Sequence, residues 1–318
     1  MKKRTKLIIF LLLIGFIFSA IIYLNLSKEN LLVIQANPDK GFNYSYFLYL
    51  PEDIKKGEAK YLLIEPNNTG TVSDDINLHK KEAKELASYG TGRYIADKLN
   101  IPLLIPSFSR PESDITMYTH ALDSDTLKNR EGKLKRIDLQ LIAMIEDAKN
   151  RLNNREINLQ DKILLYGFSA SGNFTNRFTA LYPKMVKATV SGGVNCMPIL
   201  PVEYLNKTKL IYHIGVAELK KLIGKEFDLD SYQKVPQYIF MGELDDNDTL
   251  PFDDAFNDEE RKIVKNVLGI EMKKRWEIAK DVYKQNDINA DLVMYRGIGH
   301  TVNEEIRDDI LDFFKNNI

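Results

Sequence analysis

Three side chains of the types that carry out acyl transfer lie far apart in this 318-residue sequence. Ser169 stands in the string GFSASG, Asp245 in GELDDND and His300 in GIGH. A serine hydroxyl is a weak nucleophile at its own pKa, so it needs an imidazole to take its proton and a carboxylate to orient that imidazole. The three residues therefore predict attack by Ser169 on a carbonyl carbon, with His300 as general base and then acid, and Asp245 as its orienting acid.

The surroundings of Ser169 favour it as the nucleophile. It follows an apolar run in KILLYGFSASG, residues 162–172. A serine at the apex of a sharp strand-to-helix turn needs small residues two positions to either side, because strand and helix close on it. Gly167 and Ser171 meet this need, although glycine is commoner in place of Ser171. Ser171 is a rival nucleophile, but its own flanking residues, Ser169 and Asn173, suit such a turn less well.

Strand and helix patterns alternate along the chain and would bring these residues together. Apolar and aromatic runs predict strands at residues 31–35, 44–50, 61–64, 101–106, 163–166, 186–191, 235–241 and 290–295. Apolar residues at helical spacing predict helices at about 79–99, interrupted near Gly90 and Gly92, and at 137–152, 174–181, 272–283 and 306–314. This alternation predicts an α/β layer structure with a mostly parallel sheet of about eight strands. The ends of parallel strands share one edge, so residues just beyond several strands converge there.

The motifs GFSASG, GELDDND and GIGH, in the order Ser, Asp, His, resemble those of the α/β-hydrolase superfamily. The resemblance covers nearly everything after residue 30 and implies the α/β-hydrolase fold, with helices on both faces of the sheet. It favours Asp245 over Asp246, because the family's acid commonly stands three positions after a glycine that ends its strand, here Gly242. The family's histidine follows the last strand in a glycine-containing turn, which fits His300.

The predicted domain organisation is simple. We expect residues 1–30 to form a membrane anchor or signal segment and residues 31–318 to form one α/β-hydrolase domain. Two long stretches between strand patterns, about 193–234 and 249–287, are expected to be inserted cap segments, and their arrangement would shape the substrate pocket.

Acyl transfer also needs N–H donors aimed at the oxygen on which negative charge develops. The residue after the nucleophile supplies one, so Ala170 is the first candidate for this oxyanion hole. The resemblance places the other in the loop after the third strand, which reads EPNNTG instead of the usual His-Gly-rich string. Asn67 or Asn68 is the expected second donor. The alternative is that this loop is only a polar turn.

Other kinds of chemistry find less support. The net charge is −1, from 44 basic and 45 acidic residues, so no overall field favours nucleic acid. Cys196 is the single cysteine and has no partner for a disulfide or a metal motif. The acidic stretch 245–258 lacks the glycine and glutamate of a calcium loop and is better explained as solvated. We expect no cofactor and no metal. Arg110 and His120, in the irregular stretch 107–132, could contact substrate or serve structure.

The N-terminus differs from the rest of the chain. MKKRTK precedes an almost unbroken apolar run, Leu7 to Leu24, and roughly 20 apolar residues suffice to cross a bilayer. The string Phe18-Ser19-Ala20 places a bulky residue where signal peptidase needs a small one. An uncleaved anchor with the domain on the extracytoplasmic side is therefore favoured. A cleaved signal peptide, which would give a secreted protein, and a buried core helix are the alternatives.

These observations predict an extracytoplasmic serine hydrolase that cleaves an ester bond in a small acyl substrate through an acyl-enzyme. One alternative is amide cleavage, because a Gly-x-x-Asp-Asp-Asn string also occurs in serine exopeptidases of the superfamily. Another is a catalytically silent, surface-tethered binding module on a hydrolase fold, since a fold alone does not guarantee activity. The sequence does not specify the acyl group or the oligomeric state.

Overall fold

The computed structural model describes residues 30–194 and 196–318. Apart from Asn30, the predicted N-terminal anchor lies outside these residues. Within the part that is described, no helix is both long and apolar enough to cross a membrane.

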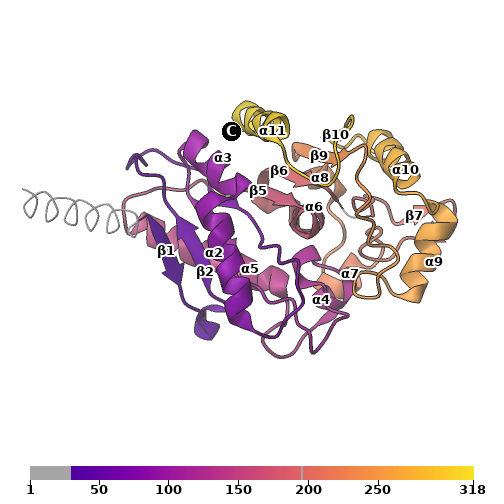
Figure 1. Cartoon of the computed structure of the whole chain (residues 1–318), viewed down its shortest axis with the longest axis horizontal. Coiled ribbons are helices and arrows are strands. Elements are labelled where there is room, and N and C mark those ends of the chain that lie inside the picture. The colour runs from indigo at the N-terminus through magenta and orange to yellow at the C-terminus, as the bar shows by residue number, and fades with distance from the viewer. Residues whose placement is uncertain (1–29, 195) are drawn as a thin grey trace, which may run out of the picture.

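One mixed sheet forms the centre of the molecule (Figure 1). Its eight strands have the spatial order β1-β2-β4-β3-β5-β6-β9-β10. The edge strand β1 pairs antiparallel with β2, β2 pairs antiparallel with β4, and the other six strands are parallel to one another. The predicted fold class and strand number are thus confirmed. The strands are β1 (Leu31–Ile34), β2 (Tyr46–Tyr49), β3 (Leu63–Ile64), β4 (Leu103–Pro106), β5 (Ile163–Phe168), β6 (Val186–Gly192), β9 (Gln237–Gly242) and β10 (Ala290–Tyr295).

Helices cover both faces of this sheet, as predicted. On one face α2 (Ile76–Tyr89), α3 (Thr91–Leu99) and α11 (Glu304–Asn317) share an apolar cluster with the side chains of Leu164 and Tyr166. On the other face α5 (Ile137–Asn153), α6 (Ala170–Leu181) and α10 (Met272–Gln285) pack with Ile163 and Leu165. Successive residues of β5 therefore serve opposite faces, which explains why a central parallel strand is apolar throughout.

The predicted interruption of the first helix falls at Gly90, between α2 and α3. A Cβ on this residue would lie 2.7 Å from Leu86 O, so the backbone can turn there only with a glycine. The stretch 107–132, predicted to be irregular, contains one short helix, α4 (Ser124–Lys128). Three single 3₁₀ turns occur in the described residues: η1 (Pro38–Lys40), η2 (Thr119–Ala121) and η3 (Pro183–Met185).

The two segments predicted as insertions pack against each other. The first carries β7 (Tyr204–Leu205), β8 (Thr208–Lys209), α7 (Leu219–Ile223) and α8 (Leu229–Tyr232), and the second carries α9 (Asp258–Val267) before α10. Both contribute to a third apolar cluster, which includes Leu210, Phe256 and also Ala170 of α6. Figure 1 shows β7, α9 and α10 together on the side of the molecule opposite β1 and β2, with α6 end-on between them. Their role as a cap stays a prediction.

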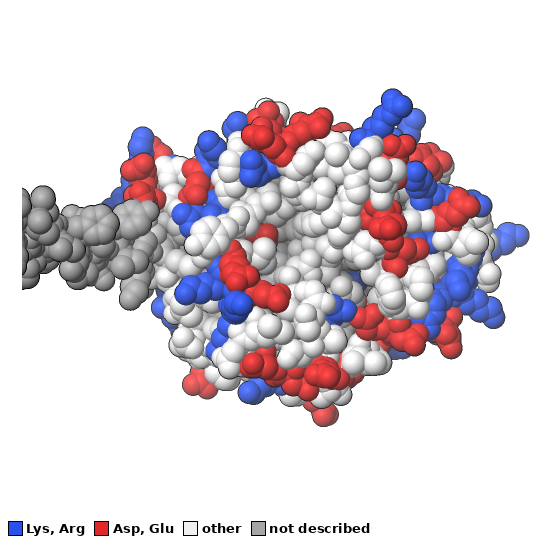
Figure 2. Space-filling model, in the orientation of Figure 1, with Lys and Arg blue, Asp and Glu red and all other residues white. Residues whose placement is uncertain are grey.

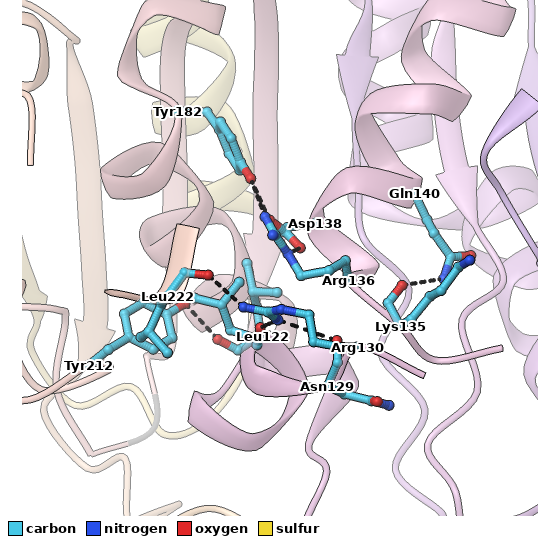
Figure 3. A network of polar contacts seen from close by, with 11 residues as sticks. Leu122, Asn129, Arg130, Lys135, Arg136, Asp138, Gln140, Tyr182, Tyr212 and Leu222 are labelled. Carbon is cyan, nitrogen blue, oxygen red and sulfur yellow. Dashed lines mark hydrogen bonds and ion pairs between the residues drawn. The ribbon is translucent and has the colours of Figure 1, made fainter. Parts of the chain in front are cut away.

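Hydrogen bonds fix the first of these segments to the stretch 107–132 (Figure 3). The buried Tyr212 hydroxyl donates to Leu122 O over 2.8 Å. Arg130 donates to Leu222 O over 2.6 Å. The segment is therefore held by directed bonds as well as by apolar contact.

Candidate active site

Ser169 lies between β5 and α6 with backbone angles φ 63° and ψ −127°. A non-glycine residue rarely adopts a positive φ, and such strain is typical of functional turns. Gly167 permits the turn, because a Cβ there would overlap the backbone oxygen of Ser171. The Ser171 hydroxyl donates to Phe168 O over 2.9 Å and accepts from Phe168 N over 3.0 Å. Ser171 is thus engaged within the turn, whereas Ser169 is partly exposed at its apex.

Asp245 and His300 are joined by a hydrogen bond. His300 Nδ1 lies 2.8 Å from Asp245 Oδ2, and the side chains are 23% and 4% exposed. The second carboxylate oxygen, Oδ1, accepts from the backbone N–H of Asn247 over 3.0 Å. Since an ionised carboxylate only accepts, His300 Nδ1 carries the proton and Nε2 has the lone pair. This is the tautomer that a general base needs. Asp246, the alternative acid, is exposed.

Two loops carry this pair, and a glycine lets them approach closely. A Cβ on Gly242, the last residue of β9, would overlap the carbonyl oxygens of Ile298 and Gly299. The Leu244 N–H donates to Ile298 O over 2.8 Å. The loop after β9 and the loop after β10 are therefore fixed to each other at the residues just before Asp245 and His300.

His300 also lies beside the Ser169 turn. Its ring centroid is 4.7 Å from that of Phe168, the residue before Ser169. Ser169 N donates to Gly192 O over 2.9 Å, and a Cβ on the adjacent Gly193 would lie 3.0 Å from His300 Cε1. However, no hydrogen bond joins Ser169 and His300 in the described chain, and His300 Nε2 is instead 3.0 Å from Asn247 Nδ2. Bonds within a catalytic site often form fully only when substrate is bound.

The loop after β3 lies against the same turn. Asn68 Nδ2 donates to Phe168 O over 3.1 Å. Asn67 is buried, and its amide brackets Phe108, donating to Phe108 O over 2.9 Å and accepting from Phe108 N over 3.0 Å. Both asparagine side chains are thus used in structural bonds. The described hydrogen bonds leave the backbone N–H groups of Asn67, Asn68 and Ala170 unused.

His120 supports this loop from inside the protein. It is 1% exposed, accepts from Thr69 N at Nδ1 over 3.1 Å, and donates from Nε2 to Phe108 O over 2.9 Å. Burial lowers the pKa of His120 to about 3, so it is neutral at ordinary pH. Arg110 forms an ion pair with Asp254 and lies over the Tyr118 ring. His120 therefore serves structure, and Arg110 joins the stretch 107–132 to the second insertion.

The acidic stretch 245–258 is more than a solvated loop. Asp248 pairs with Arg275, whose side chain is completely buried, over 2.5 Å. The sequence contains a signal for this pair, because position 275 shares the buried helix face of Trp276 and Ala279, where an arginine requires a partner. No group of three or more His, Cys, Asp or Glu suited to a metal occurs in residues 30–194 and 196–318.

The face of the molecule shown in Figure 1 is hollowed across its middle. Figure 2, in the same orientation, shows this hollow as mostly uncharged, with Lys, Arg, Asp and Glu mainly around its margin. Both acidic and basic residues occur around that margin, and acidic ones prevail along its lower part.

Known proteins give similarity in structure but not in sequence. No family model and no curated protein matches the chain. Poly(aspartic acid) hydrolase-1 from Sphingomonas sp. KT-1 superimposes with a TM-score of 0.56 at 15% identity, over 89% of this chain and 96% of that one. A poly(3-hydroxybutyrate) depolymerase from Bordetella parapertussis gives 0.55 at 15% identity, over 91% and 90%.

An S-formylglutathione hydrolase from Agrobacterium tumefaciens gives a TM-score of 0.51 at 13% identity, over 90% of this chain and 93% of that one. Two of the three are named as hydrolases and one as a depolymerase, and each matches the chain nearly end to end. At such low identities the likeness concerns the fold and not the reaction. Together with the strand order and the helices on both faces, it shows that this chain has the α/β-hydrolase fold.

Proposed function

We propose that this protein is a serine hydrolase that cleaves an ester bond in a small acyl substrate. Ser169 attacks the carbonyl carbon, His300 Nε2 takes the serine proton, and Asp245 stabilises the resulting imidazolium. His300 then returns that proton to the leaving alkoxide. In the second half-reaction His300 activates a water that releases the acyl group from Ser169, and the serine is restored.

The observation that carries this proposal is the Asp245–His300 bond of 2.8 Å placed beside a serine at φ 63°. Backbone N–H groups would stabilise the oxyanion. The first belongs to Ala170, which begins α6, and a helix N-terminus favours negative charge. The backbone of Asn67 or Asn68 would supply the second donor to the oxyanion. The neighbours named for hydrolysis of S-formylglutathione and for depolymerisation of poly(3-hydroxybutyrate) are consistent with acyl transfer to water.

The proposal includes the location and the cap. The basic N-terminus followed by an apolar run, Leu7 to Leu24, supports an anchored protein whose domain lies outside the cytoplasm. The third apolar cluster joins both inserted segments to Ala170, next to the nucleophile. We assign these segments, about 193–234 and 249–287, the role of a cap that limits the acyl group.

Labelling by a fluorophosphonate tests the nucleophile. The full chain, solubilised in detergent, should be labelled, and Ser169→Ala should abolish the label. Ser171→Ala is the matched control, because its hydroxyl lies two residues away and is bound to Phe168. Label retained by Ser169→Ala would show that the assignment is wrong.

Turnover then defines the reaction. Short p-nitrophenyl esters should be hydrolysed faster than aminoacyl anilides, and the acyl length at which the rate falls measures the pocket. The reverse preference would favour the amide hydrolase. Absence of both label and turnover would favour a binding module.

A further inference from the structure

His300 Nε2 has a partner that the proposed reaction does not use. Asn247 Nδ2 lies 3.0 Å from it, while no described side chain bonds Ser169 Oγ. Because Nδ1 carries the ring proton and donates it in the hydrogen bond to Asp245, Nε2 has the lone pair and accepts the hydrogen bond from the Asn247 amide. The same lone pair must receive the Ser169 proton in acyl transfer. The asparagine therefore competes with the nucleophile for the base.

The backbone of Asn247 is firmly held on both sides. Its N–H donates to Asp245 Oδ1 over 3.0 Å, and the next residue, Asp248, forms the ion pair with buried Arg275. The side chain itself is only half-buried. Rotation about the side-chain bonds alone can thus take the amide away from His300 without moving the acid loop.

We propose that Asn247 is a positioning residue that holds His300 in the resting enzyme and must leave Nε2 before Ser169 can react. The inference rests on the proposed function, since it concerns the base that Ser169 would use. When the reaction begins, the Asn247 N–H···Nε2 bond breaks. The Ser169 O–H proton then moves to Nε2 as Oγ bonds the carbonyl carbon, whose π electrons move to the oxygen. A protonated Nε2 cannot accept the amide N–H, so the bond belongs only to the resting state.

The loop that carries Asp245 also holds the other charged groups nearest to the acid. Asp245 bonds the ring, Asp248 is paired with Arg275 of α10, Glu243 accepts from the Gly297 N–H, and Asp246 is exposed. The Ser169 turn, residues 167–172, and the turn after β6, residues 192–194, contain no titratable carboxylate or base. Loss of the Asn247 amide should therefore be visible in the titration of His300.

The sign of the effect follows from the bond. A donor to Nε2 stabilises the neutral imidazole, so Asn247→Ala should make the ring easier to protonate and move the rise of the labelling rate to higher pH. It should also raise the labelling rate at the alkaline plateau by about 3- to 10-fold, because the resting state loses a bond that the transition state lacks. Asn247→Asp places an acceptor at Nε2, so the ring should be protonated still more easily and the rate near neutral pH should fall.

Two measurements on the full chain test the inference. The first is the fluorophosphonate labelling rate from about pH 5 to about pH 9. The second is an NMR titration of the His300 imidazole nitrogens, assigned by a His300→Gln variant, which needs no turnover. Asp246→Ala is the control, because its exposed side chain makes no described bond, and it should change neither result.

A lower plateau rate in Asn247→Ala, or an unchanged titration of His300 in both Asn247 variants, would overturn the inference. The two readouts also separate it from the proposed function. If the wild type is never labelled but the Asn247 variants still change the titration of His300, the Asn247 bond is supported and the proposed hydrolase function is wrong. Labelling that depends on Ser169, without any change in that titration, would remove only the role of Asn247.

Discussion

Arg275, fully buried on α10, forms an ion pair of 2.5 Å with Asp248, three residues after Asp245. The same guanidinium donates to Ile270 O over 2.6 Å and to Cys196 O over 3.3 Å. One side chain therefore connects the acid loop, the second insertion and the start of the first. The position of Asp245 depends on a helix that begins 27 residues further along the chain.

Replacing this arginine should damage both stability and the site. Arg275→Met removes the donor to Asp248 and to the backbone oxygens of Cys196, Gly269 and Ile270. Breaking a buried ion pair typically costs about 3–5 kcal/mol of the free energy of unfolding. Urea denaturation should show this loss, and fluorophosphonate labelling should slow. Lys56→Met removes one side of an exposed ion pair and should leave both unchanged. Equal stability of the two variants would contradict the role given to Arg275.

Gly242→Ala should move the histidine loop while leaving the core in place. The added Cβ would overlap the backbone oxygens of Ile298 and Gly299, which cannot rotate away as a side chain would. Displacing His300 by about 1 Å can cost about 100-fold in rate, measured as slower labelling by a fluorophosphonate. Gly224→Asn is the control, because it lies in open space in a left-handed conformation that asparagine tolerates.

The two asparagines of the loop after β3 should behave differently. Asn67→Ala leaves the buried N–H of Phe108 unpaired and removes one of the two donors to its C=O, the other being His120 Nε2, so the free energy of unfolding should fall by about 1–3 kcal/mol. Asn68→Ala removes one bond to Phe168 O and should change the labelling rate only a few-fold, because the backbone N–H remains. A loss of about 10²–10³-fold in Asn68→Ala would instead identify its side chain as the oxyanion donor.

Glu65, the first residue after β3, should make stability depend on pH. It is 4% exposed, its Oε2 has no partner among the described atoms, and burial raises its pKa to about 8. The pKa of Glu65 is higher in the folded than in the unfolded protein, so folding favours the protonated carboxyl. The contribution of this carboxyl to the free energy of unfolding is complete below about pH 4.5 and is lost as the pH rises towards 8. Glu65→Gln removes the ionisation and should be more stable than the wild type at pH 8, by up to about 1.4 kcal/mol for each pH unit above 4.5.

Thermal or urea unfolding of Glu65→Gln and the wild type across this range measures the difference. The advantage of the variant should grow with pH and vanish near pH 4.5. Glu65 packs closely against Gly92. A stability difference between Glu65→Gln and the wild type that does not change with pH would show that it arises from this packing and not from ionisation.

The strands and the Ser169 turn could be predicted from the sequence because their causes are local. A parallel strand buried on both faces needs an unbroken apolar run, as in Ile163 to Leu165, and a sharp turn into a helix needs a residue such as Gly167. Alternation of strands and helices then leads to one parallel sheet, whose edge collects the residues that follow its strands. The placement of Asp245 and His300 at that edge followed from these patterns.

Other contacts could be decided only by the tertiary structure. Asn247 and His300 are 53 residues apart, and Arg275 and Asp248 are 27 apart, so no periodicity relates them. The sequence indicated a polar loop at EPNNTG but not that its asparagine amides bond Phe108 and Phe168. Strand and helix patterns depend on neighbours along the chain, whereas a side-chain hydrogen bond depends on where two distant backbones come to lie and on which rotamer each side chain then adopts.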